Sequence, residues 1–129
     1  MIESAIKTAL ERITGMAAYP LLLPDTVQAG VTFQRISDPG IYAGLLRTGL
    51  IAGRFQISLY LLDSYTDLLR LDRKIWSEWK QIVHGQLDGF PVQYVDRGGI
   101  HQDKTTLTNG RNQYRLVRDF TFVYPESAE

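Results

Sequence analysis

The hydrophobic pattern at the start of the chain predicts a helix. Apolar residues recur three and four positions apart between residues 2 and 13, which places them on one helix face, and Gly15 follows as a stop signal. Three leucines then stand between Pro20 and Pro24. Because the residue before a proline is pushed toward extended backbone, we expect Leu21–Leu23 to form a buried, irregular connector.

Three later segments alternate apolar and polar residues with the period of a strand. They cover residues 31–37, 51–62 and 113–124. The turn signal Asp38-Pro39-Gly40 ends the first of them, and Pro125 ends the last. The two longer strands are expected to pair at the centre of a sheet.

A second amphipathic helix is predicted directly after the middle strand. Ser64 and Asp67 form an N-terminal capping pattern, and apolar residues then repeat at helical spacing. With Gly85 or Gly89 as its stop, this helix is about 20 residues and roughly 30 Å long. Such a helix is long enough to cross a sheet and return the chain for a parallel strand over residues 91–97.

Two glycine-containing stretches are expected to connect these elements. Residues 38–50 contain three glycines among apolar residues, which favours either a long hairpin arm or a mobile loop. Residues 96–112 are polar and include the tight-turn pair Asn109-Gly110, so we expect them to form the exposed loop of a hairpin.

The resulting order is α-β-β-α-β-β within a single domain, residues 1–129. We predict an α+β fold with two layers: a mixed four-stranded sheet of strand order 1-2-4-3, with two helices packed on one face. A chain of this length buries roughly two-thirds of the surface that it exposes when unfolded, which suffices for one core.

Composition narrows the possible classes of function. The 14 lysines and arginines balance the 14 aspartates and glutamates, so the chain lacks the broad positive field that drives non-specific nucleic-acid binding. The lack of cysteine excludes disulfides, thiolate zinc sites and a cysteine nucleophile. The first residues mix charges with apolar positions, unlike a signal peptide, and no charge-free run reaches the roughly 20 residues that span a bilayer. We therefore expect a soluble, cytoplasmic protein that contacts no membrane.

Residues suited to catalysis or metal binding are few. His84 is expected at the end of the second helix, where a histidine interacts favourably with the helix dipole, and His101 is expected in a solvated loop. Their separation argues against a two-histidine metal site, and no glycine-rich phosphate-binding motif is present. The sequence predicts no catalytic residue, no metal and no cofactor. A small hydrolase built on His101 and Asp103 is the least supported alternative.

Basic and aromatic residues are interleaved near the last strand. This arrangement suits stacking on a nucleic acid and gripping its backbone. On a strand, however, two of them share one face while Arg115 points away. The four residues are Arg111, Tyr114, Arg115 and Arg118.

The two tryptophans of the second helix have different expected environments. Trp79 lies on the apolar stripe and is expected in the core. Trp76 lies at the margin of that stripe, so it belongs either to the core or to a subunit contact. Aromatic side chains are enriched at protein interfaces, which keeps both interpretations open.

Several blocks of the sequence, taken in order, resemble one protein family. They are MIESAIKTALERI, YPLLLPD, VTFQRIS and RFQISLYLLDSYTDLLRLDRKI. Their order and spacing are similar to those of the tail terminator, or tail completion, proteins of long-tailed bacteriophages, of the lambda minor tail protein U type. The likeness covers most of the chain and includes an Arg54, Gln56 and Ile57 strand pattern, to which we assign a structural role.

This resemblance implies a structural protein and not an enzyme. It implies a small α/β subunit that forms a homo-hexameric ring on the finished tail tube, stops tube polymerisation and provides the head–tail joining surface. The implied partners are further copies of the chain, the tail tube protein and the head–tail connector, with DNA only passing through the ring. The implied locations are the virion tail and, during assembly, the bacterial cytoplasm.

The stretches 38–50 and 96–112 depart from the family pattern, so the resemblance does not assign the ring contacts; as mobile loops, they are expected to become ordered on docking to the tube. A ring of head-to-tail contacts needs two different, complementary surfaces on each subunit, and a neutral total charge suits this. The alternative function is a small nucleic-acid-binding module that uses the basic and aromatic patch on the last strand. The candidate subunit or tube contacts are Tyr42, Leu45, Arg47, Trp76, His101, Lys104, Arg111 and Arg115.

Overall fold

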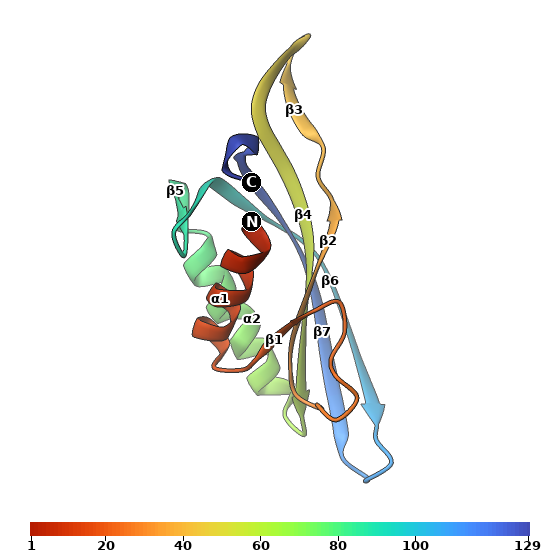
Figure 1. Ribbon diagram of the computed structural model, residues 1–129. Helices are drawn as coiled ribbons and strands as arrows, with labels where there is room; N and C mark the ends of the chain where they lie inside the picture. Colours follow the sequence, from red (N-terminus) through yellow and green to blue (C-terminus); the bar gives the residue numbers. More distant parts are fainter.

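A long, twisted sheet of seven strands dominates the structure, a computed structural model that describes residues 1–129 (Figure 1). The strands are β1 (Ala18–Pro20), β2 (Gly30–Ser37), β3 (Gly40–Ala43), β4 (Leu46–Leu62), β5 (Val83–Leu87), β6 (Phe90–Thr106) and β7 (Asn112–Pro125). The helices are α1 (Ile2–Thr14), α2 (Tyr65–Trp79) and the short 3₁₀ helix η1 (Glu126–Ala128). Both α-helices lie against the same face of the sheet (Figure 1). Neither has the length and hydropathy that a membrane-crossing helix requires.

The centre of the sheet is the antiparallel pair formed by β4 and β7. The strand order is β1-β2-β4-β7-β6-β5, and β3 pairs with β4 where β4 extends past β2. Pairing of β4 with β7 runs without a break from Leu50 opposite Pro125 to Leu62 opposite Gln113. The predicted central pairing of the two long strands is therefore confirmed. Only the short β1 pairs in parallel, with β2.

The predicted four-stranded sheet is wrong, because the sheet has seven strands, but the four predicted strands do stand in the expected order 1-2-4-3, as β2-β4-β7-β6. The predicted length of the second helix is also wrong. The helix stops at Trp79, with Lys80 as its C-cap, well before the glycines expected to end it. The chain then enters the hairpin β5–β6, whose turn is Asp88-Gly89 with φ angles of 45° and 88°. Two successive positive φ angles are typical of a type I′ hairpin turn. The chain therefore passes through an antiparallel hairpin before it enters the sheet as β6. Because β4 and β6 are both antiparallel to β7, β6 runs in the same direction as β4, so the expected crossover past one strand is present and includes β5 as well as α2.

Two expected loops also differ from the structure. Residues 96–106 belong to β6, so the predicted hairpin loop 96–112 shrinks to the few residues between β6 and β7. The leucine connector is not buried, because Leu21 and Leu22 are 60% and 77% exposed. Leu21 has a φ of 71°, and its N–H donates to the carbonyl of Phe33 at 3.0 Å, so the end of β1 turns these side chains outward.

Other elements form as expected. Helix α1 ends at Gly15, which has a φ of 70° and donates its N–H to the carbonyl of Glu11. The hydroxyl of Ser64 accepts a hydrogen bond from the N–H of Asp67 at 3.3 Å, which confirms the predicted N-cap of α2. Of the two alternatives for residues 38–50, the structure shows the hairpin arm.

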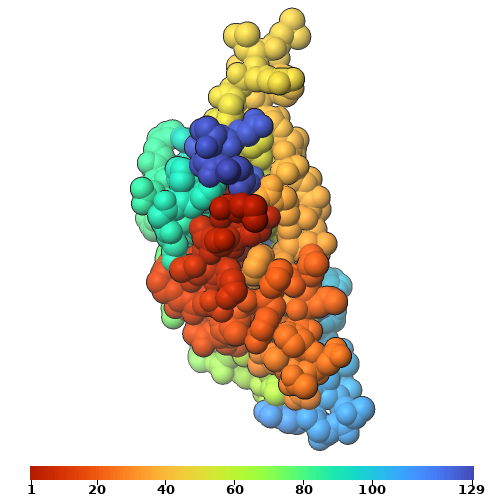
Figure 2. Space-filling view, viewed as in Figure 1, coloured from red at the N-terminus to blue at the C-terminus, as the bar shows by residue number.

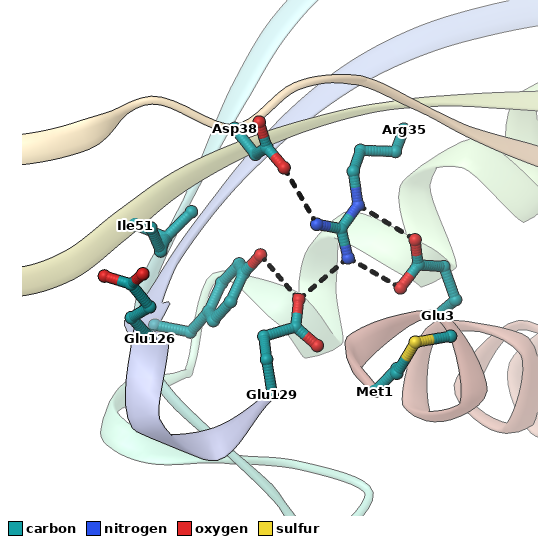
Figure 3. A pocket seen from close by; sticks show the side chains of 8 residues that line it. Met1, Glu3, Arg35, Asp38, Ile51, Glu126 and Glu129 are labelled. Atoms are coloured by element: carbon teal, nitrogen blue, oxygen red, sulfur yellow. Dashed lines mark hydrogen bonds and ion pairs between the residues drawn. The ribbon is translucent and has the colours of Figure 1, made fainter.

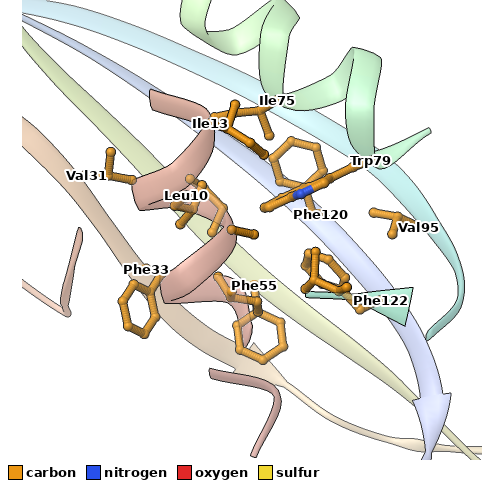
Figure 4. Packing of buried hydrophobic residues seen from close by; sticks show 14 of the residues in the cluster. Leu10, Ile13, Val31, Phe33, Phe55, Ile75, Trp79, Val95, Phe120 and Phe122 are labelled. Atoms are coloured by element: carbon orange, nitrogen blue, oxygen red, sulfur yellow. The ribbon is translucent and has the colours of Figure 1, made fainter. Parts of the chain in front are cut away.

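Trp79 lies in the core between the helices and the sheet (Figure 4). Its ring meets Phe120 and Phe122 edge-on, with centroid distances of 4.8 Å and 5.1 Å. Leu10 and Ile13 reach the same core from α1. The prediction that Trp79 is a core residue is confirmed, and the alternating residues of β4 and β7 supply the opposite wall.

We predict that the core tolerates no side chain at Gly53, in the middle of β4. A Cβ there lies 2.9 Å from Cε1 of Tyr124 and 3.1 Å from Cε2 of Phe55, and both rings are buried. Gly53→Ala should therefore lower the free energy of unfolding by about 1–3 kcal/mol, measured by urea denaturation. The control is Gly99→Ala, where a Cβ meets nothing within 4 Å. Equal losses in the two variants would contradict this account of the core.

Candidate functional site

Residues 38–50 form an arm that projects past the rest of the sheet (Figures 1 and 2). Beyond Leu50, β4 loses its partner β7 and pairs only with β3. Gly44, with a φ of 63°, is the first residue of the two-residue turn between Ala43 and Leu46, which is typical of a type II′ turn. At this tip Leu45 is 98% exposed and Leu46 is 74% exposed.

The arm gathers three of the candidate contact residues. Tyr42 lies directly opposite Arg47 in the β3–β4 pairing, so their side chains share one face of the arm. Leu45 stands at the turn between them. The hydroxyl of Thr48 donates to the carbonyl of Ile41 at 2.6 Å and ties the two strands of the arm together.

Four other candidates lie on the β6–β7 hairpin, at the opposite end of the sheet (Figure 1). Nε2 of His101 is 3.4 Å from a carboxylate oxygen of Asp103, and that carboxylate also accepts from Arg115 at 2.6 Å. The hydrogen bond from Arg115 lowers the pKa of Asp103 below its usual value. Lys104 is exposed on the same strand, and Arg111 donates to Asp63 at 2.7 Å.

His101 and Asp103 therefore do lie together, on the sheet face turned away from the helices. Asp103 is shared with an arginine, which holds it as an ion-pair partner. The other histidine is not at a helix end as expected. His84 lies in β5 with a φ of 47°, and its ring hydrogen-bonds to the side chain of Gln93. The structure contains no cluster of three or more histidine or carboxylate side chains with the geometry of a metal site.

Trp76 lies between the two groups of candidates, at the edge of the core. One face of its ring stacks on Phe120 with a centroid distance of 6.3 Å. The guanidinium of Arg97 lies over the ring, 5.1 Å from its centroid. The ring is half-buried and packs against the core, whereas Arg97 is exposed.

The basic and aromatic patch is divided between the two faces of the sheet. Tyr114 and Arg118 face the helices, and Arg115 lies on the opposite face, as the strand pattern predicts. Arg118 is only 13% exposed and donates to Asp72 of α2 at 2.8 Å. Each of the three arginines thus has its own aspartate partner, so the patch is not a continuous cationic surface.

Sequence reasoning missed a cluster of carboxylates around Arg35, at the base of the arm (Figure 3). Arg35 binds Glu3 of α1 at 2.7 Å, Glu129 at 2.8 Å and Asp38 at 3.0 Å. These groups line a cavity of about 510 Å³. The strand pattern could have indicated this cluster. Arg35 follows Val31 and Phe33 on the strand face that packs against α1, and an arginine on such a face requires carboxylate partners.

Mutual hydrogen bonds set the ionisation of this cluster. The bond to Glu3 raises the pKa of Arg35 further above its usual range. Burial raises the pKa of Tyr124, and its hydroxyl donates to Glu129 at 2.9 Å. Burial alone raises the pKa of Glu129, but the bonds from Arg35 and Tyr124 outweigh it and leave that pKa below its usual value. The cluster therefore joins both ends of the chain to β2 through charged groups.

Comparison with known proteins shows the fold and not the function. No family model matches the chain, and no curated protein sequence matches it. One similar solved structure, which carries no functional name, is 10% identical over 93% of this chain and 94% of its own, with a TM-score of 0.50. At this level of identity the likeness shows a shared fold alone.

We predict that Arg35→Met lowers the free energy of unfolding by about 2 kcal/mol, because three carboxylates lose their charged donor. The lowered pKa of Glu129 stabilises the native protein above the usual value of 4.5, and this contribution is lost as the pH falls below it. Denaturation curves at pH 7 and pH 3.5 should therefore show a smaller acid-induced loss in the variant. In the control, Arg54→Met removes an exposed ion pair, so a similar flattening there would refute the assignment.

We also predict that the Asp72–Arg118 pair holds α2 on the sheet. Asp72→Ala leaves a nearly buried guanidinium unpaired and should cost about 3 kcal/mol, whereas the double variant Asp72→Leu with Arg118→Met should recover most of that loss. Asp67→Ala removes an exposed pair of the same helix and should cost under about 1 kcal/mol. Urea midpoints measure all three. A double variant that is no more stable than Asp72→Ala would contradict the assigned pair.

Proposed function

We propose that this protein is a structural tail assembly protein of a phage or prophage, which caps the tail tube as a ring. In this role it stops tube polymerisation and provides the surface that joins the head. The observation that carries the proposal is the arm, which extends beyond the folded body and presents Leu45 and Leu46 to solvent. The ordered sequence blocks that resemble tail terminator proteins support the same role.

The exposed apolar tip of the arm is best explained by a binding partner that covers it. Apolar surface gains about 25 cal/mol for each Å² removed from water, and neighbouring exposed apolar side chains mark interaction sites. A two-stranded ribbon is also marginally stable alone, so contact with a partner stabilises its extended shape. These properties suit a subunit that completes its structure on assembly.

The two ends of the sheet differ in the way that a ring subunit requires. One end carries the apolar arm, and the other carries the β6–β7 hairpin with Lys104 and the ion pairs of Arg111 and Arg115. Head-to-tail contacts in a ring join two different surfaces of each copy, which leaves further surface for the tail tube and the head–tail connector. We assign the role to these surfaces and not to catalysis.

The nucleic-acid-binding alternative has less support. A surface that grips a phosphate backbone needs cations free to displace counterions. Arg111, Arg115 and Arg118 are instead each paired with an aspartate, and Arg118 faces the helices. DNA remains in the proposal only as the molecule that passes through the ring.

Electron microscopy of the purified protein, alone and added to polymerising tail tubes, tests the proposed function. We expect rings, or tubes that stop growing with one end capped, and uncapped tubes of variable length when the protein is omitted. The variant Leu45→Ser with Leu46→Ser should lose capping while its unfolding midpoint stays unchanged, because neither leucine contacts the core. Neither rings nor capped ends with the unmodified protein would reject the proposal.

A further inference from the structure

A second apolar surface lies beside α1, in a groove of about 380 Å³. Its apolar lining comes from Met1 and Phe33, together with Pro20 at the end of β1. Met1 is 73% exposed and Pro20 is exposed, so the groove is open to solvent. Ser4 of α1 stands on its rim.

This groove merges with the carboxylate cluster, because Met1 and Glu3 line both. The cavity of this cluster is lined by Glu126 in addition to Glu3, Asp38 and Glu129, against the single guanidinium of Arg35, so the lining side chains carry a net charge of −3. Lys7 also lines the groove, but its ammonium is held by Glu11 at 3.0 Å. The groove is therefore apolar at one end and acidic at the other.

The tip of the arm has the complementary order of side chains. Leu45 and Leu46 are followed by Arg47, which is the one charged residue between Gly40 and Leu50. Arg47 is exposed and forms no ion pair within the chain. Two leucines beside an unpaired cation thus match an apolar groove beside an excess of carboxylates.

One copy of the chain does not make this contact with itself. The arm points away from the body, and α1 begins beneath its base (Figures 1 and 2). The 98% exposure of Leu45 shows that the tip does not lie in the groove of its own chain. A contact between tip and groove therefore requires a second copy.

We propose that the arm tip of one copy docks in the groove of the next, with the tip leucines Leu45 and Leu46 against Met1, Pro20 and Phe33. Arg47 lies on the opposite face of the arm from Leu46, and this face then meets the carboxylates of Glu3 and its neighbours. The contact joins two different surfaces, so it repeats head to tail from copy to copy and is able to close into a ring. This inference rests on the proposed function and names the subunit contact of that ring.

Cysteine cross-linking tests the contact directly, because the chain has no cysteine of its own. Leu46→Cys protein is activated as a mixed disulfide with an aromatic thiol and then added to Ser4→Cys protein. The matched control replaces the second variant by Lys74→Cys, which places an exposed thiol on α2. We expect at least a tenfold faster formation of disulfide-linked dimers with Ser4→Cys than with Lys74→Cys.

A variant that carries both Leu46→Cys and Ser4→Cys, treated with a two-electron thiol oxidant such as diamide, should give a ladder of linked oligomers that ends at the ring. Adding Arg47→Glu to the Leu46→Cys protein should slow linkage to Ser4→Cys severalfold, because a like charge then meets the carboxylates.

Equal rates with Ser4→Cys and Lys74→Cys would overturn the proposed contact. If rings or capped tubes form without this linkage, the contact is wrong and the proposed function stands. If linkage is selective but tubes are never capped, the contact stands and the function is wrong.

Discussion

The unbroken pairing of β4 with β7 is the constraint on which the rest of the structure depends. Every other strand attaches to one side of this pair or the other, and both helices cover its apolar face. Because successive residues of a strand alternate between faces, a slip of one residue turns Phe55, Phe120 and Phe122 toward solvent. The buried face therefore holds the register over the whole length of the pair, and Gly53 leaves the space that Tyr124 occupies within it.

The elements with one buried face could be predicted from the sequence, and those without one could not. Helix α1, β2, β4 and β7 each carry a regular apolar pattern and were found close to their predicted bounds. The second half of β6 lies at the sheet edge with both faces exposed. Its residues are therefore polar, and this polar stretch was interpreted as a loop. The end of α2 was misplaced because Gly85 or Gly89 was interpreted as a helix stop, although Asp88-Gly89 is also a strong signal for a hairpin turn.

The positions of the candidate contact residues in the fold were predictable to a similar degree. Glycines spaced among apolar residues indicated either a hairpin arm or a mobile loop that contains Tyr42, Leu45 and Arg47, and the structure decides for the arm. Pairings between distant segments were not predictable, since nothing local in the chain links Arg118 to Asp72 or Arg35 to Glu129. Such a pairing determines whether an arginine is free to bind another molecule or instead links two elements of the fold. The basic residues near the last strand are therefore neighbours in the sequence but do not form one basic surface in the structure.

The arm is held to the sheet only by the pairing of β3 with β4, and no side chain at its tip is buried. In the contact that we propose, the residues that govern folding and the residues that govern association are nearly separate sets along one chain. A change at the arm tip then alters which copies fit together, whereas a change beside Gly53 lowers the amount of folded protein available for assembly. Under this proposal, divergence between related chains is free to concentrate in the arm and the groove, since paired changes there leave the common scaffold intact.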